Sequence, residues 1–477
     1  MSRNAEPGTG YPPPRQAWLA LIPLCTAFFM ILLDQTIVAV ATPDIMARLD
    51  ADYNAVIWVT SAFLLAYAVP LLVMGRLGDQ LGQKRIFLAG VAVFTVASLL
   101  CGLAPSIELL VGARALQGLG ASMISPQSLS VITRIFPPER RGPAMGLWGT
   151  VAGLATLTGP ILGGVIVTAL TWHWIFLVNV PVGVLCVVLG LRVIPELPGV
   201  SRSFDIPGIV VSLLAMTFLV VGLQQGESAG WAGWVWALLA GGAALVAVFI
   251  RLQARASERG VEALVPLGLF RDGDFSRGSF SIAAMGFAVA SNALPIMIYL
   301  QRFADRSALA AGLMIAPMAV VSGALAPLVG ALIGRVQPRV LSMFGFAMMI
   351  AGHLLMWLVL DPARSVWWVP AASVVLGFGN GFVWAPNSTT TMLGVRGDAV
   401  GAASGVYNTA RQVGAVLGSA ATAAFIQLRE AAGAGVEVLG QVLVMQAVVL
   451  ALGLVAVSGF SRRPRPPRGA PERAGGA

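Results

Sequence analysis

Residues 75–85 read Gly-Arg-Leu-Gly-Asp-Gln-Leu-Gly-Gln-Lys-Arg. This short basic stretch separates two apolar runs, at about residues 54–74 and 86–104. Each run is near the length of about 20 residues that a helix needs to cross a bilayer. The glycines are expected to allow a tight turn between the two helices. Asp79 can accept hydrogen bonds from the N-terminus of a neighbouring helix or pair with an arginine. An ordinary positively charged loop at a membrane surface would also explain the stretch.

Apolar runs and short loops alternate along the rest of the chain. Hydrophobic residues make up 57% of the 477 residues and charged residues only 11%, whereas about 25% of a soluble chain is charged. The sequence therefore predicts an all-helical, polytopic membrane protein with fourteen spans. The expected spans lie at about residues 17–40, 54–74, 86–104, 108–132, 143–168, 174–194, 206–224, 232–252, 278–300, 308–333, 340–360, 367–392, 399–427 and 439–460.

Positive charge predicts the orientation in the membrane. Every second loop is rich in arginine, and the loops between hold few. By the positive-inside rule both termini are expected in the cytoplasm, which requires an even number of spans in the cell membrane. The net charge of +9 then reflects membrane orientation, and no nucleic-acid partner is expected. Three scattered cysteines and two distant histidines form no metal pattern, so no metal site is expected.

The chain also repeats itself at a constant offset. Gly118 and Gly120 recur as Gly377 and Gly379, and further glycines recur at the same offset. Parallel repeats of six helices are one way in which secondary transporters are built. The expected organisation is a disordered N-terminal tail (1–16), a six-helix bundle (17–194), two extra helices with a cytoplasmic linker (195–275), a second six-helix bundle (276–460) and a disordered C-terminal tail (461–477).

Two charged residues lie inside apolar spans. Asp34 lies in the first expected span, and Arg114 lies about one turn into the fourth. A charge at the bilayer centre costs roughly 2.5–3.5 kcal/mol on insertion scales, so such residues usually face a cavity and have a function. Two alternatives remain at this stage: Asp34 could reach water from near a helix end, and Arg114 could extend its long side chain to an interface.

Glycines and a proline mark the fifth span. Gly153, Gly159, Pro160, Gly163 and Gly164 lie within it. Glycines at helical spacing let helices approach closely, and proline bends a helix. A general helix-packing face would produce the same pattern.

Residues 75–85 resemble the signature loop of the major facilitator superfamily, Gly-x-Leu-x-Asp-x-x-Gly-Arg-Lys/Arg-Arg/Lys. The matching residues are Gly75, Leu77, Asp79, Gly82, Lys84 and Arg85. The resemblance implies that these residues form a loop that switches conformation during transport. Gln80 and Gln83 stand where basic residues are common, which implies a weaker charge relay in this loop.

Further stretches resemble the fourteen-helix drug:proton antiporters of that superfamily. Residues 114–120 resemble its fourth-helix motif, which is tied to proton coupling in antiporters. Residues 159–164 resemble the antiporter motif Gly-Pro-x-x-Gly-Gly, which symporters generally lack. Residues 33–43, 172–181 and 408–414 resemble other motifs of this branch, with departures at Ala39, Thr42 and His173. The resemblance implies that Asp34 and Arg114 couple transport to protons.

The expected function is export of lipophilic small molecules in exchange for protons. A dedicated exporter of one metabolite, such as a self-made antibiotic, is the main alternative; a symporter and a membrane receptor are less favoured. No enzyme motif is recognisable, so the energy source is expected to be the proton gradient, with no cofactor. The protein is expected to be a monomer in the lipid bilayer. Other candidate cavity residues are Gln117, Trp58, Trp384 and Arg411. Because Asp34 is the one acid placed deep in a span, neutral or weakly charged substrates are expected over dications.

Overall fold

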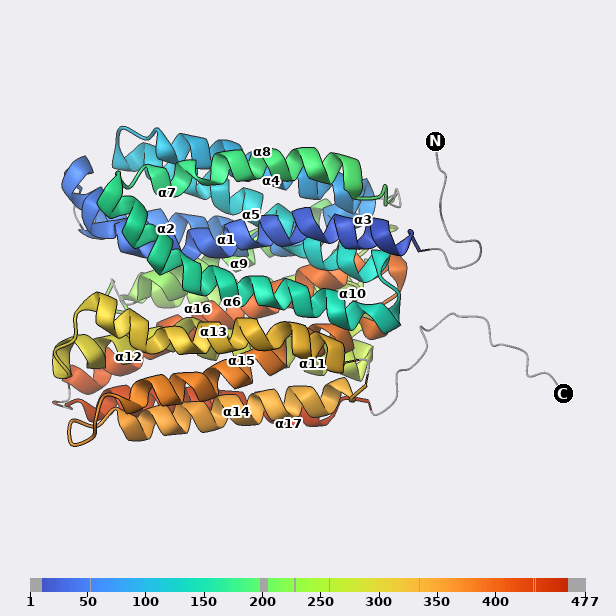
Figure 1. Cartoon of the computed structure of the whole chain (residues 1–477). Helices are drawn as coiled ribbons and strands as arrows, with labels where there is room; N and C mark the ends of the chain where they lie inside the picture. The colour runs from blue at the N-terminus through green and yellow to red at the C-terminus, as the bar shows by residue number, and fades with distance from the viewer. Residues whose placement is uncertain are drawn as a thin grey trace.

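The computed structural model describes residues 11–51, 53–197, 205–226, 229–256, 258–333, 335–431, 433 and 435–461. Within these ranges every regular element is a helix, and the long helices run side by side along an elongated molecule (Figure 1). Helix α1 (Pro14–Leu49) begins, and helix α17 (Glu437–Ser458) ends, at the same end of the molecule (Figure 1). We call this the proximal end and the other the distal end. The expected disordered tails lie largely outside the described residues.

The first half of the chain forms one helical bundle, the upper one in Figure 1. It contains α1, α2 (Tyr53–Ala68), α3 (Leu71–Leu81), α4 (Gln83–Gly102), α5 (Ile107–Ile135), α6 (Pro138–Ala169), α7 (Trp174–Leu177) and α8 (Asn179–Val193). Local sequence sets several of these boundaries. The Ser106 hydroxyl accepts a hydrogen bond from the Leu109 amide at the start of α5, as N-cap residues do. Pro138 takes the first position of α6, where its missing amide hydrogen costs nothing.

The predicted turn at residues 75–85 differs from the observed structure. The chain bends by 45° between α2 and α3, directly after Pro70, and α3 then continues to Leu81. Gly75 and Gly78 are therefore helical, and the prediction that the whole stretch is a loop is wrong. The turn is made by Gly82, whose φ of 97° is a conformation that glycine adopts without steric penalty.

Two additional helices follow the first bundle. Helix α9 (Ile206–Gly226) pairs with α10 (Gly233–Ala254), and α9 also contacts α2 and α16. The Asp205 carboxylate, just before α9, accepts hydrogen bonds from the Gly208 amide, Gln253 and Arg259. It thereby ties the start of α9 to the end of α10 and to the segment that follows. Residues 198–204 of the expected linker lie outside the described residues.

The second half forms the other bundle, the lower one in Figure 1. Its elements are η1 (Leu267–Arg271), α11 (Gly273–Ser291), α12 (Ala293–Ile298), η2 (Tyr299–Phe303), α13 (Ala308–Leu332), α14 (Pro338–Val359), α15 (Trp368–Leu393), η3 (Gly397–Ala399), α16 (Val400–Ala431) and α17. The halves meet along α6 with α13 and along α3 with α16.

Eleven described helical segments are long and apolar enough to cross a membrane, or twelve if α2 and α3 count as one bent span. Helices α6 and α16 are not among them, although each is 32 residues long. The prediction of an all-helical membrane protein is confirmed. The count of fourteen spans and the cytoplasmic location of the termini stay predictions.

Candidate functional site

The two charges predicted inside apolar spans lie together. Asp34 of α1 and Arg114 of α5 form an ion pair, and both side chains are fully buried. Gln117 links the pair, because it accepts from Arg114 Nη1 (2.6 Å) and donates to Asp34 Oδ1 (2.9 Å). Burial excludes both alternatives considered for these residues, since neither side chain reaches the surface in this structure.

Three further groups also contact Arg114 or Gln117, and sequence reasoning missed them. Arg114 Nε donates to the Val59 carbonyl oxygen of α2 (3.0 Å), and Gln117 Nε2 donates to Ser98 Oγ of α4 (2.8 Å). The Arg114 guanidinium also lies 4.3 Å from the centre of the Phe63 ring, a favourable cation–π distance. The ion pair of Asp34 and Arg114 is thus surrounded by helices α1, α2, α4 and α5. Removing either charge would leave the other buried without its partner, which is strongly destabilising.

The predicted antiporter residues of α6 lie beside the turn of α1 that follows Asp34. A side chain at Gly159 would collide with Thr36, and one at Gly163 would come within 2.8 Å of Ile37. These two glycines therefore let α6 approach α1 closely. Gly164 faces open space, with no atom within 4 Å of a Cβ placed there. Gly153 and Pro160 also belong to α6, but their surroundings lie outside the described part of the chain.

Asp79 joins the two halves at the proximal end. Its carboxylate oxygens accept hydrogen bonds from the backbone amides of Gly401 and Ala402, each at 2.8 Å, at the start of α16. An acidic group is stabilised there by the unpaired amides and the dipole of the helix N-terminus. Gln83 donates to Asp79 as well (3.1 Å). Arg76 lies 3.7 Å from Asp79 and forms an ion pair with Glu262 of the segment after α10.

Lys84 and Arg85, the basic residues of the predicted loop, have different surroundings. Lys84 is buried, donates to the Leu191 carbonyl oxygen (3.0 Å) and pairs with Glu196 (3.1 Å), both near the end of α8. Arg85 is exposed. Both contacts of Lys84 therefore join α4 to the end of α8 within the first half.

Two rows of glycine, which we call the glycine seams, bring the halves into contact at the proximal end. In the first, a Cβ added at Gly75 would lie 2.5 Å from the Gly401 carbonyl oxygen and 2.9 Å from Gly405 Cα. In the second, a Cβ added at Gly146 would lie 2.7 Å from Gly330 Cα, and Gly142 contacts the Gly330 carbonyl. Both distances are too short for a real side chain, so the backbones touch directly.

A polar contact crosses the halves nearer the middle of the molecule. Arg411 Nη2 of α16 donates to the Tyr67 hydroxyl of α2 (3.1 Å), and Tyr67 shares a hydrogen bond with Ser125 (2.7 Å). The Arg411 guanidinium lies 5.8 Å from the centre of the Trp384 ring. The predicted cavity residues Trp384 and Arg411 are thus neighbours. The third predicted cavity residue, Trp58, is exposed on α2. Tyr67 was not predicted from the sequence, where its only signal is that the chain holds just five tyrosines.

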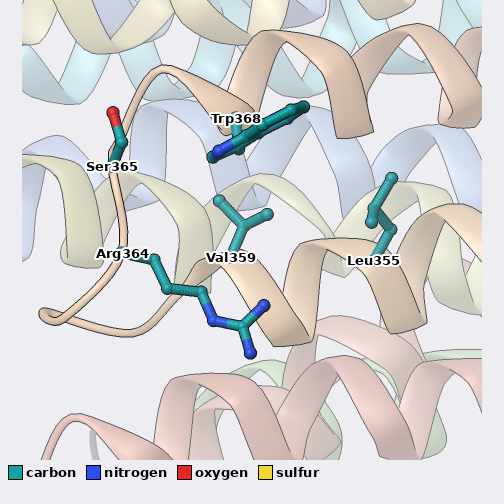
Figure 2. Close-up of a pocket in the computed structure, with 5 residues that line it drawn as sticks. All are labelled: Leu355, Val359, Arg364, Ser365 and Trp368. Carbon is teal, nitrogen blue, oxygen red and sulfur yellow. The ribbon is translucent and has the colours of Figure 1, made fainter.

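A hollow at the distal end lies apart from these residues. Figure 2 shows Trp368 above Val359, with Arg364 and Ser365 on the loop that joins α14 to α15. Trp367 and Trp368 are both exposed. Tryptophan at the ends of membrane helices is typical of the boundary between lipid and water, so we interpret this hollow as part of that boundary.

Comparison with known families decides the identity. The model of the Major Facilitator Superfamily matches residues 24–419. The chain belongs to the major facilitator superfamily. It is therefore a multi-pass transporter of the cell membrane and not an enzyme. Its fold agrees, since the crystal structure of the human organic anion transporter MFSD10 (TETRAN) aligns with a TM-score of 0.68 over 93% of this chain and 100% of that one, at 13% identity.

Several bacterial proteins of this kind are similar over most of the transporter. An uncharacterised transporter of the same superfamily from Mycobacterium tuberculosis is 46% identical over 88% of this chain and 72% of its own. The multidrug resistance protein Stp of M. tuberculosis is 34% identical over 85% of this chain and 75% of its own. The tetracenomycin C resistance and export protein of Streptomyces glaucescens is 33% identical over 84% of this chain and 74% of its own.

Proposed function

We propose that this transporter exports lipophilic small molecules in exchange for protons. The observation that carries the proposal is the buried ion pair of Asp34 and Arg114, walled by four helices of one bundle. An aspartate can take up a proton, whereas an arginine stays charged at any physiological pH. Protonating Asp34 would weaken its attraction to Arg114 and release α1 from α5. The glycine contacts of α6 on α1 then carry that change toward the interface between the halves.

The proposal includes alternating access across fourteen spans, with the proximal end in the cytoplasm. The asymmetry of contacts supports closure of the proximal end in this structure: α16 packs far more extensively on α3, in the proximal half, than on α2. The glycine seams and the bonds of Asp79 close the proximal end in this structure. Asp79 would thus act as a latch of the outward-facing state, which a monomer can accomplish by rocking its two bundles about the central site.

Two substrate ranges fit the relatives. Stp is named for multidrug resistance, which supports a broad range of drugs. The Streptomyces glaucescens relative is named for one compound, tetracenomycin C, which supports the second candidate, a dedicated exporter of a single metabolite. The proton-coupling network serves both, since it lies within the first bundle and need not contact the substrate.

The direct test is transport in proteoliposomes with an imposed pH gradient, following a neutral lipophilic dye and the internal pH together. Asp34→Asn is expected to lose gradient-driven transport by about 100-fold or more, because the amide cannot ionise, while dye binding persists. Asp205→Asn is the matched control, since it makes the same change at an acid outside the network. Full gradient-driven transport by Asp34→Asn would eliminate the proposal.

A further inference from the structure

The network around Asp34 and Arg114 has a counterpart in the second half that backbone contacts identify. Gly118 of α5 packs against the Phe63 carbonyl oxygen of α2. Its repeat partner Gly377 of α15 packs against the Met318 carbonyl oxygen of α13. The two helix pairs therefore cross at equivalent points, with Met318 in the place of Phe63.

A second pair of glycines aligns a third helix of each half. Gly120 packs against the backbone of Phe94 in α4, and Gly379 packs against the backbone of Met349 in α14. Met349 therefore stands in the place of Phe94. The position one helical turn further along is then equivalent as well, because both segments are regular helix.

This alignment shows what has replaced the charged network. One turn beyond Phe94 is Ser98, the partner of Gln117, and one turn beyond Met349 is His353. Arg114 itself is replaced by Ser373, according to the glycine register. The counterpart thus keeps a buried polar side chain from the third helix but has lost the guanidinium.

A small pocket occupies this counterpart position. Its walls include Asn292 of α11, Met318 of α13, Met349 and His353 of α14, and Leu376 and Asn380 of α15. The space between them holds about one water molecule, or a group of that size. The methionine side chains are adaptable and polarisable, as in surfaces that accept varied ligands.

His353 lines this pocket and carries a buried acceptor. The side chain is 1% exposed, and Nδ1 lies 2.8 Å from the Met349 carbonyl oxygen. A carbonyl can only accept, so Nδ1 carries the hydrogen and Nε2 of the neutral ring is an acceptor. This Nε2 atom has no hydrogen-bond partner among the described residues.

Asn292 and Asn380 add one acceptor and one donor. Asn292 is 4% exposed, and its amide nitrogen contacts Met318 Sδ (3.9 Å), while Oδ1 has no protein partner among the described residues. Asn380 Oδ1 accepts from the Trp384 indole (2.9 Å), which leaves Asn380 its amide hydrogens to donate. A hydroxyl group both donates and accepts, so it matches this set of groups.

Trp384 links the pocket to the contact between the halves. The Trp384 side chain that holds Asn380 also faces Arg411, which in turn bonds Tyr67 of the first half. A substrate between the bundles could therefore insert a polar group beside Asn380 while its apolar body stays at the interface.

We propose that this pocket binds a hydroxyl group of the transported lipophile and so selects neutral substrates that carry a hydrogen-bond donor. The proposal rests on the export function proposed above. Buried acceptors without partners are costly, and the hydrogen of a ligand hydroxyl satisfies one of them where its methyl ether satisfies none. The pocket thus supplies specificity, and the ion pair of the first half supplies coupling.

The test compares the binding of para-phenylphenol and of its methyl ether to the purified full-length transporter. The wild type is expected to bind the phenol more tightly by roughly two- to tenfold, the range of one neutral hydrogen bond. Asn292→Leu and His353→Phe each remove one acceptor, so the variant that removes the acceptor of the phenol hydrogen should bring the two affinities together by weakening only the phenol. The control is Ser342→Ala, which removes a buried hydroxyl of α14 that lies outside the pocket. It should keep the wild-type preference.

Equal binding of the two compounds by the wild type, or binding of neither, would overturn the proposal. So would a preference for the phenol that survives in both Asn292→Leu and His353→Phe, with His353→Leu in the place of the second if it does not fold. A phenol preference that these variants abolish, in a protein without proton-driven transport, would support the pocket and refute the exporter. The two proposals can therefore fail separately.

Discussion

In the first half of the transporter, α1, α2, α4 and α5 enclose an aspartate–arginine pair, whereas the matching helices of the second half enclose uncharged side chains. The glycine contacts that set the helix crossings recur in both halves. From residue 273 onward, no Asp, Glu, Lys or Arg among the described residues is fully buried. The repeat therefore preserves the backbone packing of the two halves, whereas their buried charges differ.

This difference has an energetic meaning. Replacing a buried ion pair by well-packed apolar groups is often neutral or stabilising. In the second half, Ser373 stands at the position of Arg114 and Leu376 at the position of Gln117, within the same helix packing. The fold therefore does not require Arg114 and Gln117. Their presence in one half is better explained by a function that needs a charge, and proton coupling is such a function.

The largest expected effect comes from the two repeat partners Arg114 and Ser373. Arg114→Lys should lower proton-driven transport by at least about tenfold, since lysine lacks the planar fork that bonds several acceptors at once. Arg114→Ala should remove the wild-type dependence of transport on pH and destabilise the protein by roughly 3–5 kcal/mol, because Asp34 stays buried without its partner.

Ser373→Ala, at the equivalent point of the second half, should leave both the rate and the pH dependence unchanged. The measurement is the initial rate of gradient-driven transport across a range of pH, normalised to folded protein. A wild-type pH profile in Arg114→Ala, or a changed one in Ser373→Ala, would remove the distinction between the halves.

A smaller effect is expected at the contact between the halves. Asp79→Asn keeps the shape of the side chain but loses the charge that the α16 N-terminus stabilises. The proximal end should open more often, so cysteines placed along the proximal part of the central path should react several-fold faster with a thiol reagent. Asp361→Asn, at an exposed acid, serves as the control. Unchanged reactivity in Asp79→Asn would show that the carboxylate does not hold this end closed.

The rate of export is expected to depend on the charge of the substrate. Among the described residues of the first bundle, Asp34 and Arg114 are the buried charges away from the proximal end, and the half-buried Arg411 lies at the contact between the halves. In the proposed mechanism Asp34 takes up the proton, which leaves two guanidinium groups near a substrate between the bundles. Among matched neutral, monocationic and dicationic dyes, the dication should be exported most slowly, because two guanidinium groups repel it in a medium of low dielectric. Efflux from proteoliposomes measures the series. Fastest export of the dication would reveal an acid on the path that this assignment omits.

The smallest effect is expected outside both halves, at Asp205. Burial alone would raise the pKa of Asp205, but hydrogen bonds from Arg259, Gln253 and the Gly208 amide outweigh it and hold the pKa below its usual value. The ionised carboxylate therefore stabilises the fold above the usual aspartate pKa of about 3.9, and this stability is lost as the pH falls through the lowered pKa.

Asp205→Asn should accordingly lower the stability by about 1–3 kcal/mol at neutral pH and leave proton coupling intact. Thermal unfolding in detergent should show the difference from the wild type narrowing as the pH falls. A difference that does not change with pH, or a loss of coupling in a well-folded variant, would contradict this assignment.

The sequence was sufficient for the parts of the site that carry charge in an apolar setting. Asp34 and Arg114 interrupt apolar runs, and a charge there must find a partner, so their placement inside the bundle could be predicted. The hydrogen-bond partner of Asp79 could be predicted as a helix N-terminus, but only the structure gives α16. Ser98 and the Val59 carbonyl could not be found, since serines are common in membrane helices and a carbonyl has no sequence signature. The turn was misplaced because Gly75 and Gly78 serve a helix contact rather than a bend.

The glycine seams have a consequence for the speed of the transport cycle. Closing an interface normally immobilises side chains, and a long side chain loses up to about 2 kcal/mol of rotamer entropy. Where Gly75 meets Gly401 and Gly405, and where Gly142 and Gly146 meet Gly330, there are no rotamers to freeze. In the proposed cycle of alternating access, the proximal end would thus close and reopen with little ordering of side chains on each turnover. The lifetime of the closed state then depends on a few polar bonds, chiefly the two from the α16 amides to Asp79, which a single proton or a single substitution can alter.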